Sequence, residues 1–87
     1  MTKIEQRILY LLTKHGGQAR HSQLQQAMAR IPTEDREQAL RMLEELGLVK
    51  SGKSPSKTRP ALLYWLTPAG KEHVEDAIAR GDMGDPR

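Results

Sequence analysis

The fold of this chain is decided by residues 41–49, whose sequence is RMLEELGLV, and by residues 65–70, whose sequence is WLTPAG. In the first stretch an amphipathic helix ends before Gly47, since glycine readily adopts the left-handed backbone that stops a helix, and the apolar residues after it begin a strand. In the second stretch a strand ends and Thr67 caps a new helix. Pro68 occupies the first helical position, where a missing N–H costs nothing. Together the two stretches predict the order helix, strand, strand, helix.

Apolar spacing extends this order toward the N-terminus. Residues 2–14, 22–29 and 34–46 each carry a helical apolar stripe, and residues 18–20 between the first two form a short extended segment at most. The two strands, at residues 48–51 and 61–66, flank a polar loop at residues 52–60 and predict an antiparallel hairpin. The last helix runs from Pro68 to about residue 80, and a frayed tail is expected at residues 81–87.

The third helix is expected to begin after an N-cap at Thr33 and to turn one apolar face inward. Acidic residues in its first turn favour the positive end of the helix dipole. The residues expected on its inner face are Ala39, Leu40, Met42, Leu43 and Leu46.

The two quoted stretches resemble the end of a recognition helix with its first wing strand, and the end of a second wing strand, in winged helix-turn-helix regulators of the MarR and PadR type. The resemblance covers residues 4–80. It implies a mainly α fold with a small β-hairpin: a three-helix core, a two-stranded wing and a C-terminal helix, in one domain at residues 1–80. The long extra helices of full-length MarR proteins are not matched, so their ligand pocket and dimer geometry do not carry over.

Composition excludes several classes of function. The 87 residues contain no cysteine, which rules out disulfides, zinc–thiolate sites and cysteine nucleophiles. The three histidines lack a metal-ligand spacing, and no cofactor motif or nucleophile–base arrangement is present, so no enzyme, metal or cofactor is expected. No signal-peptide or membrane-spanning pattern is found, which favours the cytoplasm and its nucleoid. Aromatic residues are few, which disfavours base stacking on a single strand.

The predicted wing concentrates positive charge. Residues 49–67 contain no acidic residue and four cations, Lys50, Lys53, Lys57 and Arg59. Unopposed cations on a projecting loop attract phosphates and release counterions, and Arg59 suits a narrow minor groove. The alternative is a solvated loop whose lysines serve solubility.

The third helix carries the candidate base-reading residues. Gln38 suits adenine and Arg41 suits guanine, each through paired hydrogen bonds. Three glutamates on the same outward surface oppose a polyanion, and Glu37 stands four residues before Arg41, where the two can simply pair. The first helix of a helix-turn-helix commonly crosses the DNA backbone. The remaining candidate DNA contacts are therefore Arg20 and Ser22 around the second helix, with Thr33 and Arg36 in the third.

Two functions follow as hypotheses. The first is a small regulator that binds double-stranded DNA, acts as a repressor or accessory factor, and forms a homodimer through its first helix, its last helix or its tail. The alternative is a winged-helix module that binds a protein partner in a replication, partition or transcription assembly, which the acidic surface of the third helix favours. Tyr64 and Trp65 alternate along the second strand, so one ring is expected in the core and the other outside, where it can serve a partner interface.

Overall fold

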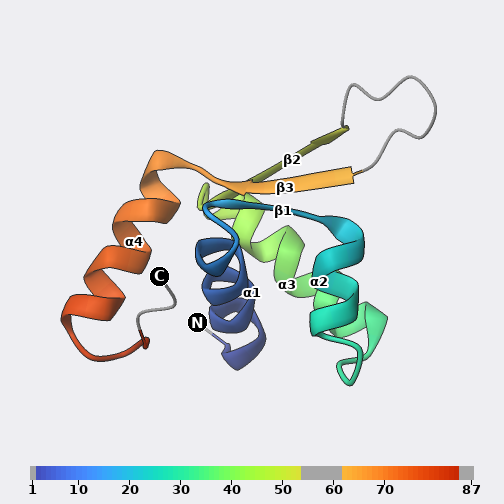
Figure 1. Ribbon diagram of the computed structural model, residues 1–87, viewed down its shortest axis with the longest axis horizontal. Helices are drawn as coiled ribbons and strands as arrows, with labels where there is room; N and C mark the ends of the chain where they lie inside the picture. Colours follow the sequence, from blue (N-terminus) through green and yellow to red (C-terminus); the bar gives the residue numbers. More distant parts are fainter. Residues whose placement is uncertain (1, 54–61, 85–87) are drawn as a thin grey trace.

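The computed structural model describes residues 2–53 and 62–84 of the chain. Its elements are α1 (Lys3–Lys14), β1 (Gln18–Arg20), α2 (His21–Ala27), α3 (Thr33–Glu45), β2 (Val49–Lys53), β3 (Leu62–Leu66) and α4 (Pro68–Ala79). Helices α1, α2 and α3 lie on one side of a small sheet, and α4 lies beyond one end of it (Figure 1). The predicted architecture, a helical core with a hairpin and a C-terminal helix, is confirmed.

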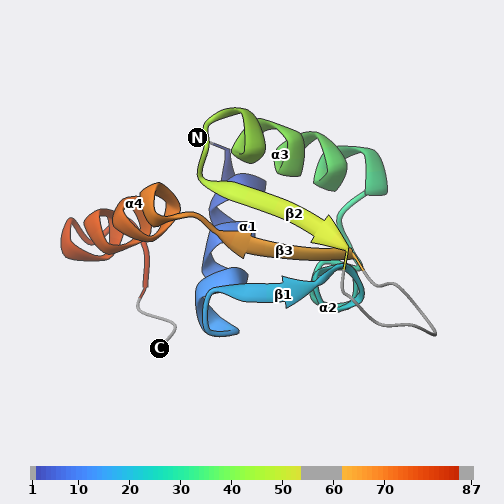
Figure 2. The same cartoon turned by 90° about the horizontal axis from the view of Figure 1, so that it is seen from above.

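The sheet has one strand more than the predicted hairpin. Strands β2 and β3 pair antiparallel as expected, and β1 pairs antiparallel with the other edge of β3, which gives the order β1-β3-β2. The extended segment at Gln18–Arg20 is therefore a strand, and Figure 2 shows it beside β3. Its single buried residue, Ala19, pairs with the buried Tyr64. The hydrogen bond from Leu66 N–H to the Gly17 carbonyl, 2.8 Å long, extends this pairing.

Local signals set most of the helix ends. Thr2 and Glu5 form a reciprocal capping box at the start of α1. Gly16 and Gly47 follow the C-caps of α1 and α3 with φ of +80° and +75°, the left-handed conformation that glycine adopts without a Cβ penalty. The predicted cap at Thr33 is wrong: Pro32 takes the N-cap position with ψ of 141°, and Thr33 is the first helical residue.

Helix α2 also differs from its predicted range of 22–29. It begins at His21 and ends at Ala27, because a turn at residues 28–30 precedes Ile31 and Pro32. Proline disfavours helical backbone in the residue before it, here Ile31, so Pro32 prevents the helix from resuming after this turn. The shift places His21, rather than Ser22, at the first position of α2.

The core forms around α1, which packs against α3, α4 and the sheet. Its fully buried side chains are Ile8, Leu9, Leu12, Leu24, Met28, Leu43 and Val49. The inner face predicted for α3 is too wide, because Met42 and Leu46 are 40% and 54% exposed. These two residues stand four apart and share a neighbouring face of the helix, whereas Ala39, Leu40 and Leu43 face the core.

Thr67 joins the end of α3 to the start of α4. Its hydroxyl donates to the Gly47 carbonyl and accepts from Gly70 N–H at 3.0 Å, and its own N–H donates to the Leu48 carbonyl at 3.1 Å. Gly70 packs against the same segment, since a Cβ there would overlap the Leu48 carbonyl oxygen. Thr67 and Gly70 therefore hold β3 and α4 against the turn that leads from α3 into the wing.

Candidate nucleic-acid interface

An open hollow of about 450 Å³ lies where α2, α3 and the sheet meet. Its wall combines the first residue of α2, the wing side of α3, and one face of β2 and β3. The residues that line it are His21, Glu37, Leu40, Arg41, Glu44, Ser51, Leu62 and Tyr64. The fold thus gathers the helix-turn-helix and the base of the wing around one surface.

The two candidate base readers lie on the exposed side of α3. Arg41 lines the hollow next to the wing, whereas Gln38 lines a second hollow, of about 180 Å³, next to the N-terminal end of α1. The alternative pairing of Arg41 with Glu37 is not formed, because no carboxylate in the described part of the chain lies within 4.0 Å of the Arg41 guanidinium. Both side chains are exposed and available to a ligand.

Acidic side chains share this surface, and they affect Tyr64. Burial raises the pKa of the Tyr64 phenol above its ordinary value of 10.0, Glu44 and Glu37 raise it further, and Arg36 opposes them. The phenol is therefore neutral at physiological pH. Its hydroxyl lies 3.5 Å from Nδ1 of His21, so it links β3 to the start of α2. Sequence reasoning missed this contact, although strand alternation did indicate that one of the two neighbouring rings turns inward.

The two wing lysines in the described residues, Lys50 and Lys53, lie on opposite faces of the sheet. Paired residues in adjacent strands place their side chains on the same face of a sheet, and successive residues alternate. Lys53 pairs with Leu62 and so lies on the face of the hollow, whereas Lys50 pairs with Trp65 on the opposite face. The other two predicted wing contacts, Lys57 and Arg59, lie outside the described residues.

The candidate DNA contacts near the starts of α2 and α3 lie in different places. Ser22 and Thr33 are exposed in the first turns of α2 and α3. Arg20 precedes α2, and its backbone N–H donates to Oε1 of Gln23 at 2.9 Å. Because Arg20 pairs with Leu63, its side chain lies on the same face of the sheet as Lys50 and Trp65.

Arg36 differs from every other candidate because it is buried. Only 3% of its surface is exposed, and its Nε atom has no hydrogen-bond partner in the described structure. Arg36 shares the inward face of α3 with Ala39, Leu40 and Leu43. This placement leaves Arg36 little surface to offer a phosphate. Its position three, four and seven residues before Ala39, Leu40 and Leu43 is the helical spacing of the inward face, and the prediction followed its charge instead.

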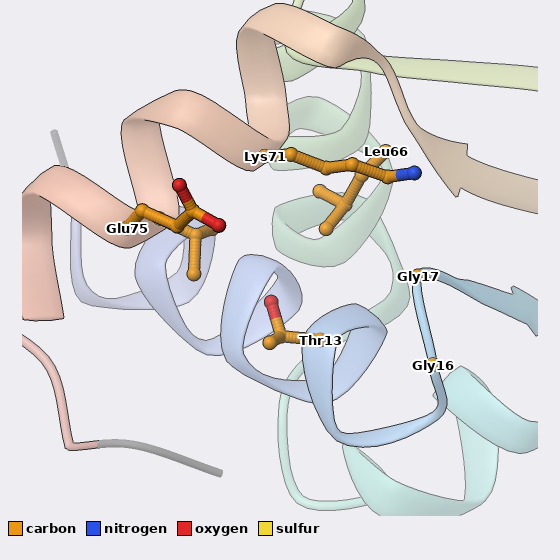
Figure 3. Close-up of a pocket in the computed structure, with 7 residues that line it drawn as sticks. Thr13, Gly16, Gly17, Leu66, Lys71 and Glu75 are labelled. Atoms are coloured by element: carbon orange, nitrogen blue, oxygen red, sulfur yellow. The ribbon is translucent and has the colours of Figure 1, made fainter. Parts of the chain in front are cut away.

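A further hollow, of about 210 Å³, lies between α1 and α4 and is mostly apolar (Figure 3). It is lined by Thr13, Gly16, Gly17, Leu66, Lys71, Val74 and Glu75. Within residues 2–53 and 62–84, His, Asp and Glu form no group of three or more that could hold a metal ion. In the same ranges no helix is long and apolar enough to cross a membrane.

Comparisons with known proteins agree with this geometry. The family model for HxlR-like helix-turn-helix proteins matches residues 2–80. The solved structure of ytfH from Salmonella typhimurium, assigned as a transcriptional regulator, is 26% identical with a TM-score of 0.73, over 94% of this chain and 70% of that one. TA0346 from Thermoplasma acidophilum, assigned likewise, is 26% identical with a TM-score of 0.64, over 91% and 81%.

The zinc-responsive MarR family member ZitR of Lactococcus lactis shares the fold, with 21% identity and a TM-score of 0.72 over 94% of this chain and 54% of its own. No curated protein matches the sequence. The expected resemblance to winged-helix regulators is confirmed, and the matching family model identifies the group. The chain belongs to the HxlR-like helix-turn-helix family.

Proposed function

We propose that this chain is a DNA-binding transcription regulator that reads duplex DNA with α3 and steadies it with the wing. The observation that carries the proposal is the exposed side of α3, where Gln38 and Arg41 are both accessible and Arg41 lines the hollow on the sheet face that also carries Lys53. The family match and the transcriptional regulators among the similar structures support the same function. Such regulators are generally not enzymes.

In this proposal α3 enters the major groove, because a groove about 12 Å wide admits a helix. Arg41 donates two hydrogen bonds to a guanine edge and Gln38 pairs with adenine. Ser22 and Thr33, at the starts of α2 and α3, bind phosphates, and Lys53 contacts the backbone. We assign Lys57 and Arg59 to the same role by their charge alone. The burial of Arg36 removes it from the contact set.

The glutamates of α3 have a defined place in this scheme. Glu34, Glu37 and Glu45 are exposed, and each repels phosphates. A glutamate also accepts a hydrogen bond from N4 of cytosine, so an acidic residue within the groove restricts sequence instead of adding affinity. The cations of the wing offset the repulsion. A single protomer therefore binds DNA weakly but with a sequence preference. A homodimer on a two-fold symmetric site supplies the remaining affinity, and a repressor or accessory role follows if that site overlaps a promoter.

The test is fluorescence anisotropy with selected duplexes at several salt concentrations. We expect Arg41→Ala to relax sequence preference, and Lys53→Ala to weaken binding to all sequences and lower the salt slope by about one. Arg80→Ala is the matched control, since Arg80 is the C-cap of α4, a helix that lies away from the wing (Figure 1), and its exposed ion pair with Asp82 contributes little. Unchanged affinity and preference in both test variants would remove α3 and the wing as the binding surface.

The acidic surface of α3 favours a second function, a winged-helix module that binds a basic protein partner. The two functions separate by charge reversal. Changing Lys53, Lys57 and Arg59 together to glutamate abolishes DNA binding in the first case and leaves the partner interaction in the second. Glu37→Gln gives the opposite comparison: it strengthens non-specific DNA binding in the first case and weakens partner binding in the second.

A further inference from the structure

The interface above does not use Trp65, the one tryptophan of the chain. Tyr64 and Leu66 are buried on the helix side of β3, so alternation places Leu63 and Trp65 on the other side. Their partners in the neighbouring strands are Gln18, Arg20, Lys50 and Gly52. We call these six residues the outer sheet face. Figure 1 shows α1, α2 and α3 below the sheet, so none of these helices covers the outer sheet face.

The indole ring of Trp65 forms an apolar platform on this face. A Cβ on Gly52 would lie 2.9 Å from Cη2 of Trp65, which shows that the ring lies across the Gly52 backbone. The ring is only partly buried, so one part of it packs on β2 and the rest meets solvent. A shallow hollow of about 350 Å³ opens beside it, lined by Gly16, Gly17, Gln18, Trp65, Leu66 and Lys71.

Three cations lie on the same surface as the ring. Lys50 is the direct strand partner of Trp65, and Arg20 pairs with the neighbouring Leu63. Lys71 comes from α4: its side chain extends past Leu66 and away from Glu75 (Figure 3), and its Cε lies 3.8 Å from where a Cβ on Gly17 would be. All three cations are exposed, and no carboxylate in the described residues lies within 4.0 Å of them.

We propose that the outer sheet face, with Lys71, binds an acidic segment of a protein partner. An apolar side chain of that segment occupies the hollow beside Trp65, and its carboxylates meet Lys50, Lys71 and Arg20. The outer sheet face has no acidic residue of its own, so an acidic segment gains attraction without a repelling neighbour. A partly exposed tryptophan beside arginine is the composition expected at the centre of a protein interface.

Nucleic acid fits this surface less well. Single strands are held by successive aromatic rings on which successive bases stack, and this face has one. A duplex backbone offers phosphates to the cations but no apolar group for the indole. The surface also lies on the opposite side of the sheet from Lys53 and the hollow that contains Arg41, so it stays accessible while α3 holds DNA.

The probe for the test is a short, dye-labelled synthetic peptide of alternating glutamate and leucine, followed by anisotropy. We expect saturable, salt-sensitive binding that shifts the emission of Trp65. Trp65→Ala and Lys71→Glu should each weaken binding about tenfold, the usual effect of removing an interface centre. Lys3→Glu, a matched charge reversal at the far end of α1, should leave binding unchanged. Circular dichroism checks that each variant folds. If Trp65→Ala does not fold, the Lys71→Glu variant, which changes an exposed residue, tests the proposal.

Three results would overturn the proposal: no binding of the acidic peptide by the wild type, equal binding of a lysine–leucine peptide, or affinity that Lys71→Glu leaves unchanged. Displacement of the peptide by a single-stranded oligonucleotide that binds more tightly would reassign the surface to nucleic acid. Duplex binding is measured in parallel on the Lys71→Glu variant. Because Lys71 lies outside the proposed DNA interface, the Lys71→Glu variant should keep its affinity for duplex DNA. A protein that binds duplex DNA but not the peptide contradicts this proposal alone, whereas a protein that does not bind duplex DNA contradicts the DNA-binding function.

Discussion

Thr67 allows a quantitative test of how the wing is joined to α3. Thr67→Val keeps the shape of the side chain and removes its hydroxyl. The lost N-cap bond to Gly70 N–H costs about 1 kcal/mol. The lost bond to the Gly47 carbonyl costs about 1 kcal/mol more, and not the larger cost of a buried unpaired group, because Gly47 is exposed and its carbonyl can bind water. The expected loss in the free energy of unfolding is therefore roughly 2 kcal/mol.

Thr67→Ser is the matched control, because it keeps both hydrogen bonds and loses one buried methyl group, worth about 0.8 kcal/mol. Urea denaturation followed by circular dichroism gives the free energy of unfolding of both variants. In thermal denaturation the valine variant should melt about 10 °C below the wild type. The reasoning predicts that the valine variant is less stable than the serine variant by about 1 kcal/mol. A serine variant as unstable as the valine variant would mean that side-chain packing, and not the hydroxyl, stabilises the contact between the end of α3 and the start of α4.

Three further predictions follow from buried groups. Gly70→Ala should lower the free energy of unfolding by about 1–3 kcal/mol in the same denaturation assay, because its Cβ overlaps the Leu48 carbonyl, and an unchanged stability would contradict the close packing. Arg36→Met should leave stability equal or higher and duplex affinity unchanged, because the guanidinium is buried with Nε unpaired; weaker DNA binding in anisotropy would return Arg36 to the interface. Since the fold raises the pKa of Tyr64, its stabilisation is complete below pH 10.0 and is lost as pH rises through the folded pKa. Tyr64→Phe should flatten this alkaline loss of stability in denaturation curves, and an alkaline loss that remains unchanged in this variant would contradict the prediction.

The sequence predicts those parts of the fold that depend on local chemistry. Thr2, Gly47 and Thr67 end or begin helices through bonds to their own neighbouring backbone, so their roles follow from residue type alone. Strand β1 was only partly predictable, because Gln18–Arg20 has a single apolar residue and its pairing with β3 is a tertiary contact. Leu46 was misplaced for a similar reason: helical spacing does not tell which element packs against a side chain, and Leu46 is 54% exposed.

The candidate site was predictable as a set of residue types but not as a surface. Charge indicated the wing lysines, yet only the strand register shows that Lys50 and Lys53 lie on opposite faces. The exposure of Arg41 and the inward position of Arg36 both follow from helical periodicity, but the positive charge of Arg36 favoured a phosphate contact over burial in the prediction. The contact between Tyr64 and His21 joins residues 43 apart in sequence, beyond the reach of any local pattern.

The central claim is that this chain binds duplex DNA through α3 and the wing. The most direct test is anisotropy of the purified protein with a pool of random duplexes across salt concentrations, followed by selection and sequencing of the bound fraction. The account predicts binding that weakens steeply with salt and an enriched, two-fold symmetric motif whose guanine preference disappears in Arg41→Ala. No binding even at low salt would contradict the claim.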